Sequence, residues 1–304
     1  MRDDPFRPAW GSGARARVAA ALDREGGAFL LEGRKAVLDA LSRSTVRVRE
    51  VWVAEGADAE LLDALDHAAR GRATSVGLAP ARELERASDT VTPQGVLAVA
   101  DDVAWQPADL VRGARGPLLL LDRVQDPGNV GAVVRVAAAF GASGILVGEG
   151  TADPLGAKAL RASAGTAVAI PFARGPLAAL LPVLAAASVP VWLLDGAPAP
   201  AGASSSVWDA PPAPKIFVLA VGSEGRGPSD ELRQAAARTV FIPISPTVES
   251  LNAAVAVGIA AALLFGRARA DASPRRDAGA GPRDGPTPRD AGGGGRRPSA
   301  GRRP

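Results

Sequence analysis

The chain has 304 residues, of which 47% are hydrophobic, and this is enough to bury the cores of two ordinary domains. It contains no cysteine and one histidine, His67. Disulfides, thiolate nucleophiles, Cys-ligated metal centres, a histidine pair on a metal and a Ser-His-Asp triad are therefore excluded. Any catalysis has to use Arg, Lys, Asp, Glu, Ser, Thr or Asn, and we expect no metal.

The net charge of +3 is divided unevenly along the chain. Residues 267–304 contain ten Arg and four Asp, a net charge of +6, so the other 266 residues carry −3. Residues 269–304 are Arg-, Gly- and Pro-rich with almost nothing to bury, and we expect them to be disordered. Such a tail either adds salt-dependent affinity for nucleic acid or only reflects the Arg, Gly and Pro usage of the whole chain.

The first residues do not have the pattern of a targeting signal. Residues 1–17 carry charges and prolines without an apolar core, and we expect 1–26 to form a flexible N-terminus. No apolar run reaches the roughly 18 residues that a membrane-spanning helix needs. The expected location is the cytoplasm, with no membrane partner.

The first half of the chain alternates short strand and helix patterns and predicts a small α/β domain over residues 27–104. The expected strands are 29–32, 46–53, one near 75–76, and 96–103. The expected helices are 33–41, 58–70 and 81–87. A polar stretch that contains Pro and Gly, 105–116, is typical of a linker.

The second half, residues 117–268, has near-continuous apolar strands separated by helices, which predicts a parallel sheet covered on both faces. The expected strands are 118–122, 145–147, 168–172, 191–194, 216–221 and 239–242. The expected helices are 129–140, 155–161, 176–187, 229–237 and 250–265. Residues 196–214 are expected to form a loose loop.

Three short segments lie where a strand ends and a helix begins, and ligands bind at the carboxyl ends of strands in open α/β sheets. The first segment is Asn129-x-Gly131-x-x-x-Arg135. Asn129 stands where a helix N-cap belongs, and Gly131 shares a helix face with Arg135, so we expect the glycine to leave space for the arginine. An arginine on a helix of Val, Ala and Phe is a candidate functional residue.

The second segment runs from Gly222 to Gly227 and contains three glycines that let the backbone approach a ligand. It lacks the Lys-Ser/Thr of a phosphate-binding P-loop and does not follow the first strand, so neither an NTPase nor a dinucleotide site fits. Glu224 within it would bind a ribose hydroxyl or an arginine, or else be the solvated carboxylate of a tight turn.

The third segment, Ser250-Leu251-Asn252, enters the last helix after 242–247. Ser250 has the residue type of an N-cap. Asn252 is expected in the first turn of an otherwise apolar helix, where a buried amide needs hydrogen-bond partners.

These segments, in this order and at this spacing, resemble the three signature motifs of the SpoU/TrmH family of RNA ribose 2′-O-methyltransferases. Glu32-Gly33-Arg34 and Gln94-Gly95-Val96 resemble the substrate-binding domain that precedes the catalytic domain in rRNA-modifying members. The resemblance covers about 240 residues, as judged from the motif positions. It implies a SPOUT-type parallel sheet with a C-terminal trefoil knot, which is rare among folds.

The resemblance further implies S-adenosylmethionine as cofactor and a homodimer whose active site draws on both subunits. By position, Gly222, Ile242, Ile244, Leu251 and Asn252 would contact the cofactor. The implied catalytic residues are Asn129, Arg135, Glu224, Ser250 and Asn252. A guanidinium is almost never deprotonated in proteins, so we expect Arg135 to bind phosphate and stabilise charge on the 2′-oxygen instead of acting as a base.

Four positions depart from the family pattern: Pro93, Pro228, Pro246 and Ala254. None removes an implied active-site residue, but they leave the RNA target and the loop near Pro246 open. We favour 23S rRNA as substrate. A tRNA ribose methyltransferase and a non-catalytic RNA-binding or ribosome-associated protein of the same fold are the alternatives.

The beginning of the small domain is basic, with Arg34, Lys35, Arg43, Arg47 and Arg49. Local patches decide RNA binding more than net charge does. We expect Arg34 and Lys35, together with Arg135, to contact RNA; a solvated helix surface is the plain alternative.

Overall fold

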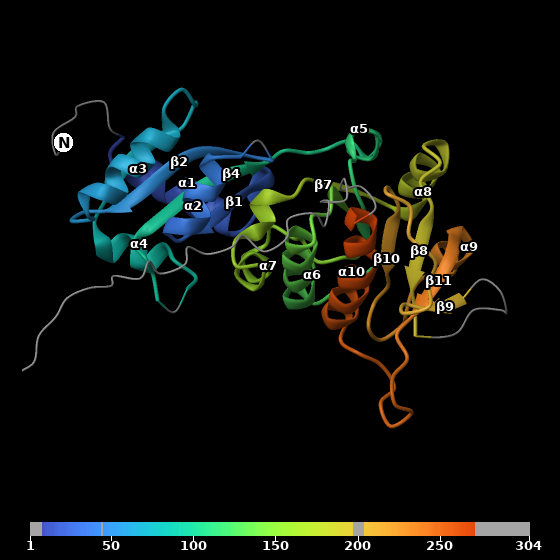
Figure 1. Cartoon of the computed structure of the whole chain (residues 1–304). Coiled ribbons are helices and arrows are strands. Elements are labelled where there is room, and N and C mark those ends of the chain that lie inside the picture. Colours follow the sequence, from blue (N-terminus) through green and yellow to red (C-terminus); the bar gives the residue numbers. More distant parts are fainter. Residues whose placement is uncertain (1–7, 44, 91, 197–203, 271–304) are drawn as a thin grey trace, which may run out of the picture. The chain divides into compact units, whose positions relative to one another are not determined.

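Two β-sheets organise the chain in this computed structural model, which describes residues 8–43, 45–90, 92–196 and 204–270 (Figure 1). The first sheet has four strands in the order β1-β4-β2-β3, and the second has seven in the order β7-β6-β5-β10-β8-β11-β9. Residues 1–272 cluster as one unit. The expected disordered tail lies outside the described residues, apart from the end of the last helix.

The first sheet is mixed and belongs to the small N-terminal domain. Its strands are β1 (Ala28–Glu32), β2 (Val46–Ala54), β3 (Ser75–Ala79) and β4 (Val96–Asp102). β4 runs antiparallel to β1 and β2, while β2 and β3 are parallel. The helices are α1 (Ser12–Leu22), α2 (Arg34–Leu41), α3 (Ala59–Ala69) and α4 (Ala81–Ala87), and a short turn η1 (Glu25–Gly27) precedes β1.

Helix α1 corrects the expectation of a flexible N-terminus for residues 12–22. Ala14, Val18 and Ala21 recur at helical spacing and are buried against β1 and β4. Their small side chains give a weak apolar signal in the sequence, yet they fit closely against the sheet, where Trp52 is also fully buried.

The second sheet is parallel throughout and confirms the expected fold class. Its strands are β5 (Leu118–Leu121), β6 (Gly144–Gly148), β7 (Phe172–Gly175), β8 (Val191–Leu194), β9 (Ser204–Ser206), β10 (Val218–Val221) and β11 (Ala236–Phe241). The helices are α5 (Pro107–Gly113), α6 (Pro127–Ala139), α7 (Ala157–Ala162), α8 (Leu177–Ala186), α9 (Asp230–Ala235) and α10 (Ala253–Ala270), with a short turn η2 (Thr166–Ala169).

The central strand β5 shows how this sheet is buried on both sides. Leu119 and Leu121 point to the face covered by α6 and α10, while Leu118 and Leu120 point to the face covered by α5 and α8. Successive side chains of a strand alternate between faces, so a run of four leucines serves two cores at once. All four are fully buried. Figure 1 shows α6 and α10 side by side in front of the sheet.

Three expected boundaries were wrong. Residues 105–116 contain α5, whose Leu110 and Val111 are buried in the core, and so they are not only a linker. The strand expected at 168–172 is the turn η2 followed by β7. The loop expected at 196–214 contains the edge strand β9, whose serines have no apolar pattern. Within the described residues, no helix is long and apolar enough to span a membrane.

Candidate functional site

The three sequence segments follow β5, β10 and β11, which end at the same edge of the parallel sheet. β10 pairs with β5 on one side and with β8 on the other, and β8 pairs with β11. The carboxyl ends of these strands therefore bring the three loops together, as expected for a ligand site in an open α/β sheet.

The loop between β5 and α6 is capped differently from the expectation. The N-cap of α6 is Asp126, whose carboxylate accepts a hydrogen bond from the Gly128 backbone N–H at 2.6 Å, and Pro127 takes the first helical position. This hydrogen bond, assisted by Lys158, lowers the pKa of Asp126. Asn129 is consequently in the first turn of the helix, and its side chain is available for other contacts.

Gly131 does not make space for Arg135. A β-carbon at Gly131 would lie 2.3 Å from the carbonyl oxygen of Ala159 and 2.6 Å from the Ala162 side chain, both on α7. The glycine therefore allows close packing of α6 against α7. At the other end of α6, Gly141 has the positive φ of 67° expected of a glycine that ends a helix.

The loop Gly222–Gly227 folds back on itself. A β-carbon at Gly222 would lie 2.3 Å from the backbone nitrogen of Pro228, so no larger residue fits there. The Gly227 N–H donates to the Ser223 carbonyl oxygen at 2.9 Å, which closes the turn. The buried carboxylate of Asp122 accepts the Ser229 N–H at 2.8 Å and ties the base of this loop to the end of β5.

The start of α10 differs from what was expected for Ser250 and Asn252. The helix begins at Ala253, and the Asn252 side-chain oxygen accepts the backbone N–H groups of Ala254 (3.0 Å) and Val255 (3.3 Å). Asn252 is thus the N-cap, and its side chain is exposed instead of buried. Ser250 lies in the preceding loop.

A chain of hydrogen bonds joins the three segments. The Asn252 Nδ2 donates to Asn129 Oδ1 at 2.8 Å, and the Asn129 Nδ2 donates to Glu224 Oε1 at 2.5 Å. The carboxylate fixes the orientation of the first amide, and that amide fixes the second. Three residues implied as catalytic, each from a different one of the three segments, are therefore held in one cluster.

Beside this cluster lies a pocket of about 380 Å³ that we call the loop pocket. Its lining includes the sequence-predicted residues Gly222, Glu224, Ile242, Ile244, Ser250 and Leu251. Asp195 and Glu249 also line it and were missed by the sequence analysis, although Asp195 directly follows strand β8. Among the described lining residues there are three carboxylates and no Lys or Arg. Asp195 pairs with Arg233 just outside the lining.

Arg135 does not reach the loop pocket of its own chain. It is exposed on α6, and its side chain has no hydrogen-bond or ion-pair partner within the described part of the chain. It lines a separate cavity of about 500 Å³, which also includes Lys35 and Arg43. Arg34 is not part of this cavity; its guanidinium lies 3.5 Å from Asp58 and 4.0 Å from Glu60.

The motif residues of the N-terminal domain shape its own backbone. Gly33 has a φ of 93°, and a β-carbon there would lie 2.8 Å from the Gln94 side-chain oxygen, which accepts the Arg34 N–H. Glu32 accepts hydrogen bonds from the Ser88 hydroxyl and the Asp89 N–H. No group of His, Cys, Asp or Glu in the described residues is arranged to hold a metal ion.

Comparisons with known proteins agree with this architecture. Residues 116–262 match the SpoU rRNA Methylase family, and residues 30–105 match the RNA 2′-O ribose methyltransferase substrate binding family. A Mycobacterium avium protein named "uncharacterized tRNA/rRNA methyltransferase" is 37% identical over 235 residues, which cover 75% of this chain and 74% of that protein.

Two further relatives have more specific names. The 23S rRNA (guanosine(2553)-2′-O)-methyltransferase RlmP of Bacillus subtilis is 35% identical over 57% of this chain and 65% of that protein. The AdoMet-bound rRNA methyltransferase of Sinorhizobium meliloti has a similar structure, with a TM-score of 0.73 at 26% identity over 86% of this chain and 96% of that one.

The fold, the three converging loops and the preceding small domain define an RNA methyltransferase that uses S-adenosylmethionine. The chain belongs to the SpoU family of RNA 2′-O-ribose methyltransferases. The resemblance seen in the sequence is thereby confirmed. The trefoil knot and the roles of the individual site residues stay predictions.

Proposed function

We propose that this enzyme methylates the 2′-hydroxyl of a ribose in 23S rRNA. The observation that carries the proposal is the Asn252–Asn129–Glu224 hydrogen-bond chain beside the loop pocket, which joins all three signature segments. The presence of a substrate-binding domain and the similarity to the Bacillus subtilis 23S rRNA enzyme favour rRNA over tRNA.

The loop pocket fits S-adenosylmethionine in shape and in charge. Val221, Ile242 and Leu251 offer apolar contacts for an adenine ring, while the backbone at Gly222 is open to close approach. The donor carries a net positive charge because of its sulfonium, and an acidic lining without Lys or Arg among the described residues favours it over the neutral product. When bound, the donor supplies a methyl group that is already activated for transfer.

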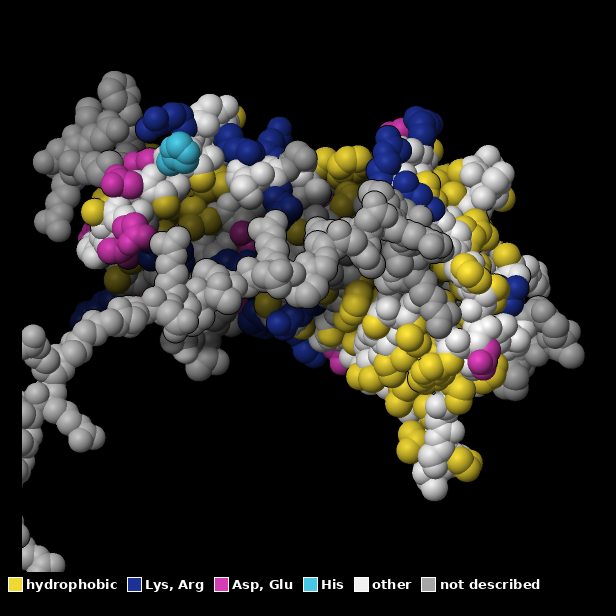
Figure 2. Space-filling model, in the orientation of Figure 1, with side chains coloured by type: hydrophobic (Ala, Val, Ile, Leu, Met, Phe, Trp, Pro, Cys, Tyr) yellow, Lys and Arg dark blue, Asp and Glu magenta, His cyan; other side chains and the backbone are white. Residues whose placement is uncertain are grey.

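The position of Arg135 leads us to propose a homodimer with composite active sites. Arg135 lies outside the loop pocket of its own chain, so a second subunit has to supply it. Large apolar side chains are exposed on and before α10: Val255 (52%), Val248 (49%) and Ile244 (37%). Figure 2 shows hydrophobic side chains gathered over this part of the surface. A surface of this kind suits burial in a subunit interface.

In the composite site, Arg135 has an electrostatic role. Its guanidinium, which stays charged at all physiological pH values, would hold the phosphate next to the target ribose and stabilise negative charge on the 2′-oxygen as its proton passes to water. The O–CH3 bond would form as the donor's S–CH3 bond breaks, which leaves the neutral thioether product. The Glu224–Asn129–Asn252 chain would keep the loops aligned. Alignment of an activated donor with the hydroxyl provides most of the acceleration in such a transfer.

The RNA target is tested by mapping ribose methylation in rRNA and tRNA from a strain that lacks this protein. We expect one 23S rRNA nucleotide to lose its 2′-O-methyl group and to regain it with the wild-type gene but not with Arg135→Ala. Loss of a methyl group from tRNA instead would favour the alternative substrate. Unchanged methylation, together with no calorimetric binding of S-adenosylmethionine, would favour a non-catalytic RNA-binding protein.

The composite site is tested by mixing two inactive variants. Leu251→Arg places a cation in the loop pocket and should abolish donor binding, while Arg135→Ala leaves the pocket intact. Random re-association makes half of the dimers heterodimers, each with one complete site, so about a quarter of wild-type activity should return. If each chain uses its own Arg135, the mixture will stay inactive.

A further inference from the structure

A cationic groove lies between α2 of the N-terminal domain and α6 of the catalytic domain. Lys35, Arg43 and Arg135 line this cavity of about 500 Å³, and Asp39 is the one carboxylate among its described lining residues. The remaining walls are uncharged residues from the end of α6 and from the segment 165–170 that contains η2. We call it the α2–α6 groove.

Two of the three cations of the groove lack a side-chain partner in the described residues, unlike several other arginines of the N-terminal domain. Arg47 and Arg49 both bind Asp101, and Arg17 binds Glu50. By contrast, neither Arg43 nor Arg135 has a side-chain partner in the described residues, and only Lys35 is paired, with Asp39 at 2.5 Å. A groove that gathers cations without side-chain partners is typical of a polyanion-binding site.

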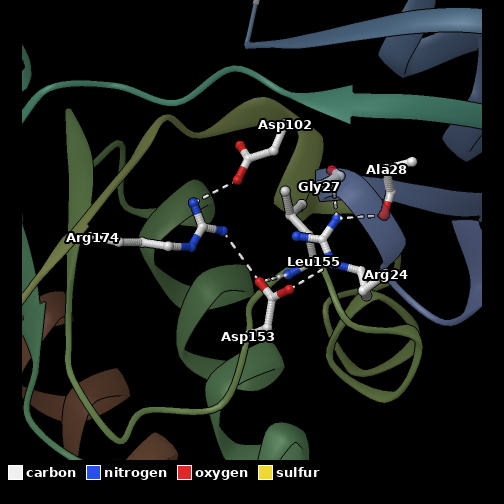
Figure 3. Close-up of polar contacts among 7 residues, drawn as sticks. All are labelled: Arg24, Gly27, Ala28, Asp102, Asp153, Leu155 and Arg174. Carbon is white, nitrogen blue, oxygen red and sulfur yellow. Dashed lines mark hydrogen bonds and ion pairs between the residues drawn. The ribbon is translucent and has the colours of Figure 1, made fainter.

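The two walls of the groove are fastened to each other. Figure 3 shows Asp153 of the catalytic domain between Arg24 of the N-terminal domain, at 2.6 Å, and Arg174, at 3.2 Å; Arg174 also binds Asp102. Burial works to raise the pKa of Asp153, but the charge of Arg24, the Leu155 N–H and the charge of Arg174 outweigh it and lower that pKa.

Two more contacts hold the N-terminal domain against the catalytic domain. The Thr45 hydroxyl donates to the Val168 carbonyl oxygen, and Arg161 pairs with Asp89. Gly165 has a φ of 76°, and a β-carbon there would lie 3.0 Å from Ala36 on α2. The groove is therefore built by specific contacts, and Arg135 stands at a fixed place along it.

We propose that the α2–α6 groove binds the phosphate backbone of the RNA next to the target ribose, so that the N-terminal domain of one subunit serves the loop pocket of the other. This inference rests on the proposed composite site. Because Arg135 works in the partner's pocket and lies in the groove of its own chain, RNA bound along Lys35 and Arg43 arrives at the partner's methyl donor. Arg43 is thereby assigned as an RNA-binding residue.

RNA affinity gives the first test. Arg43→Glu should weaken binding of an rRNA fragment roughly tenfold at physiological salt and make the salt dependence of log K shallower by about one unit per lost phosphate contact. Binding of S-adenosylmethionine should not change. The matched control is Arg82→Glu, an equal charge change on the exposed face of α4, which should leave RNA affinity within about twofold. Equal effects of the two variants would overturn the assignment of Arg43.

Whether the groove of one subunit serves the loop pocket of the other is tested by placing Arg43→Glu in either of the two chains of the mixing experiment. When Arg43→Glu is placed in the Arg135→Ala chain, it changes a groove that does not lead to the one complete site of the heterodimer. About a quarter of wild-type activity should therefore remain. Added to the Leu251→Arg chain, Arg43→Glu affects the groove that carries the working Arg135, and activity should fall at least tenfold further. Equal loss in both arrangements, or the reverse order, would overturn the proposal.

The two proposals fail in distinguishable ways. If the mixture of Arg135→Ala and Leu251→Arg without any groove change stays inactive, the composite site is wrong, and with it the delivery between subunits. If that mixture is active but the two placements of Arg43→Glu do not differ, the composite site stands and only the delivery between subunits is wrong.

Discussion

The loop pocket and the α2–α6 groove have opposite charge. The described lining of the pocket has three carboxylates and no Lys or Arg, whereas the groove has three cations and one carboxylate. A pocket for a sulfonium compound gains from negative charge, and a surface for RNA phosphates gains from positive charge. The net charge of −3 over residues 1–266 therefore hides two sites that suit two oppositely charged ligands.

The two regions also differ in how they are built. The loop pocket is formed by loops of one sheet, joined by the Glu224–Asn129–Asn252 chain. The groove lies between two domains and leaves the side chains of Arg43 and Arg135 without partners in the described residues. A site whose polar groups already bind one another positions a small ligand, whereas unpaired cations gain most when phosphates arrive.

The largest expected effect is that of Arg135→Ala. Methyl transfer should slow by about 100- to 1,000-fold because charge on the 2′-oxygen loses its stabilising partner. S-adenosylmethionine affinity, measured by calorimetry, should change little, because the proposed partners of Arg135 are the RNA phosphate and the 2′-oxygen and not the donor. Arg135→Lys distinguishes a general base from an electrostatic role. Near-full activity, with a rate that follows the ionisation of the lysine, would support a base and contradict our proposal.

Gly222→Ala should damage the loop pocket. The new β-carbon would clash with the Pro228 nitrogen, and the required loop shift should weaken S-adenosylmethionine binding by about tenfold or more. Gly225→Ala is the matched control, since nothing lies within 4 Å of a β-carbon there. Binding that is equally weak in both variants would show that the close contact at Gly222 is not the cause.

Two substitutions of Asn252 distinguish its contribution to stability from its contribution to activity. Asn252→Ala removes the α10 cap and should lower the free energy of unfolding by about 1 kcal/mol. Asn252→Asp keeps a capping oxygen for the Ala254 and Val255 N–H groups but loses the donor to Asn129, so stability should return while methylation stays low. Thermal unfolding and a methylation assay measure the two. Full activity of Asn252→Asp would exclude a role for the hydrogen-bond chain.

The smallest expected effect concerns Asp153. Because its folded-state pKa is lowered, its ion pairs stabilise the protein above the ordinary carboxyl pKa of about 4, and this contribution is lost as pH falls through the lowered value. Asp153→Asn should therefore be less stable than wild type at pH 7, by about 0.5–1 kcal/mol since the pair is partly exposed.

The stabilities of wild type and Asp153→Asn also have to be compared at low pH and against a control variant. The difference between wild type and Asp153→Asn should vanish once Asp153 is protonated in the folded protein. Burial raises the pKa of Asp102 against the charge of Arg174, and the charge of Asp153 raises it further. Asp153→Asn removes that last cause, so the low-pH comparison has to be made where both carboxyls are protonated. Asp109→Asn, in an exposed pair with Arg112, should show little difference at either pH. A pH-independent difference at Asp153 would contradict the ion-pair explanation.

Hydrophobic pattern predicted most strands and helices, since Leu118–Leu121 and the apolar helix faces report burial directly. Local rules for caps were less reliable. Asp126 and Asn252 are the caps, whereas Asn129 and Ser250 were expected in that role, because any of these residue types can cap and only the exact start of the helix decides. The serines of β9 carry no apolar signal at all.

Only part of the site could be predicted from the sequence. The motif loops identify Gly222, Glu224, Ile242, Ile244, Ser250 and Leu251, which line the pocket, whereas Asn252, also implied as a cofactor contact, does not line it. What Gly131 and Arg135 contact depends on how α6 packs against α7 and lies near α2, which no local pattern reveals. The role of Arg43 likewise becomes visible only when two domains are placed together.

The most direct test of the account is a structure of the homodimer with S-adenosylmethionine bound. We predict the donor in the loop pocket between Gly222 and Leu251, with the guanidinium of Arg135 from the second subunit at the mouth of that pocket, where the target ribose and its phosphate would lie. A donor bound elsewhere, or Arg135 directed away from the loop pockets of both subunits, would contradict the account.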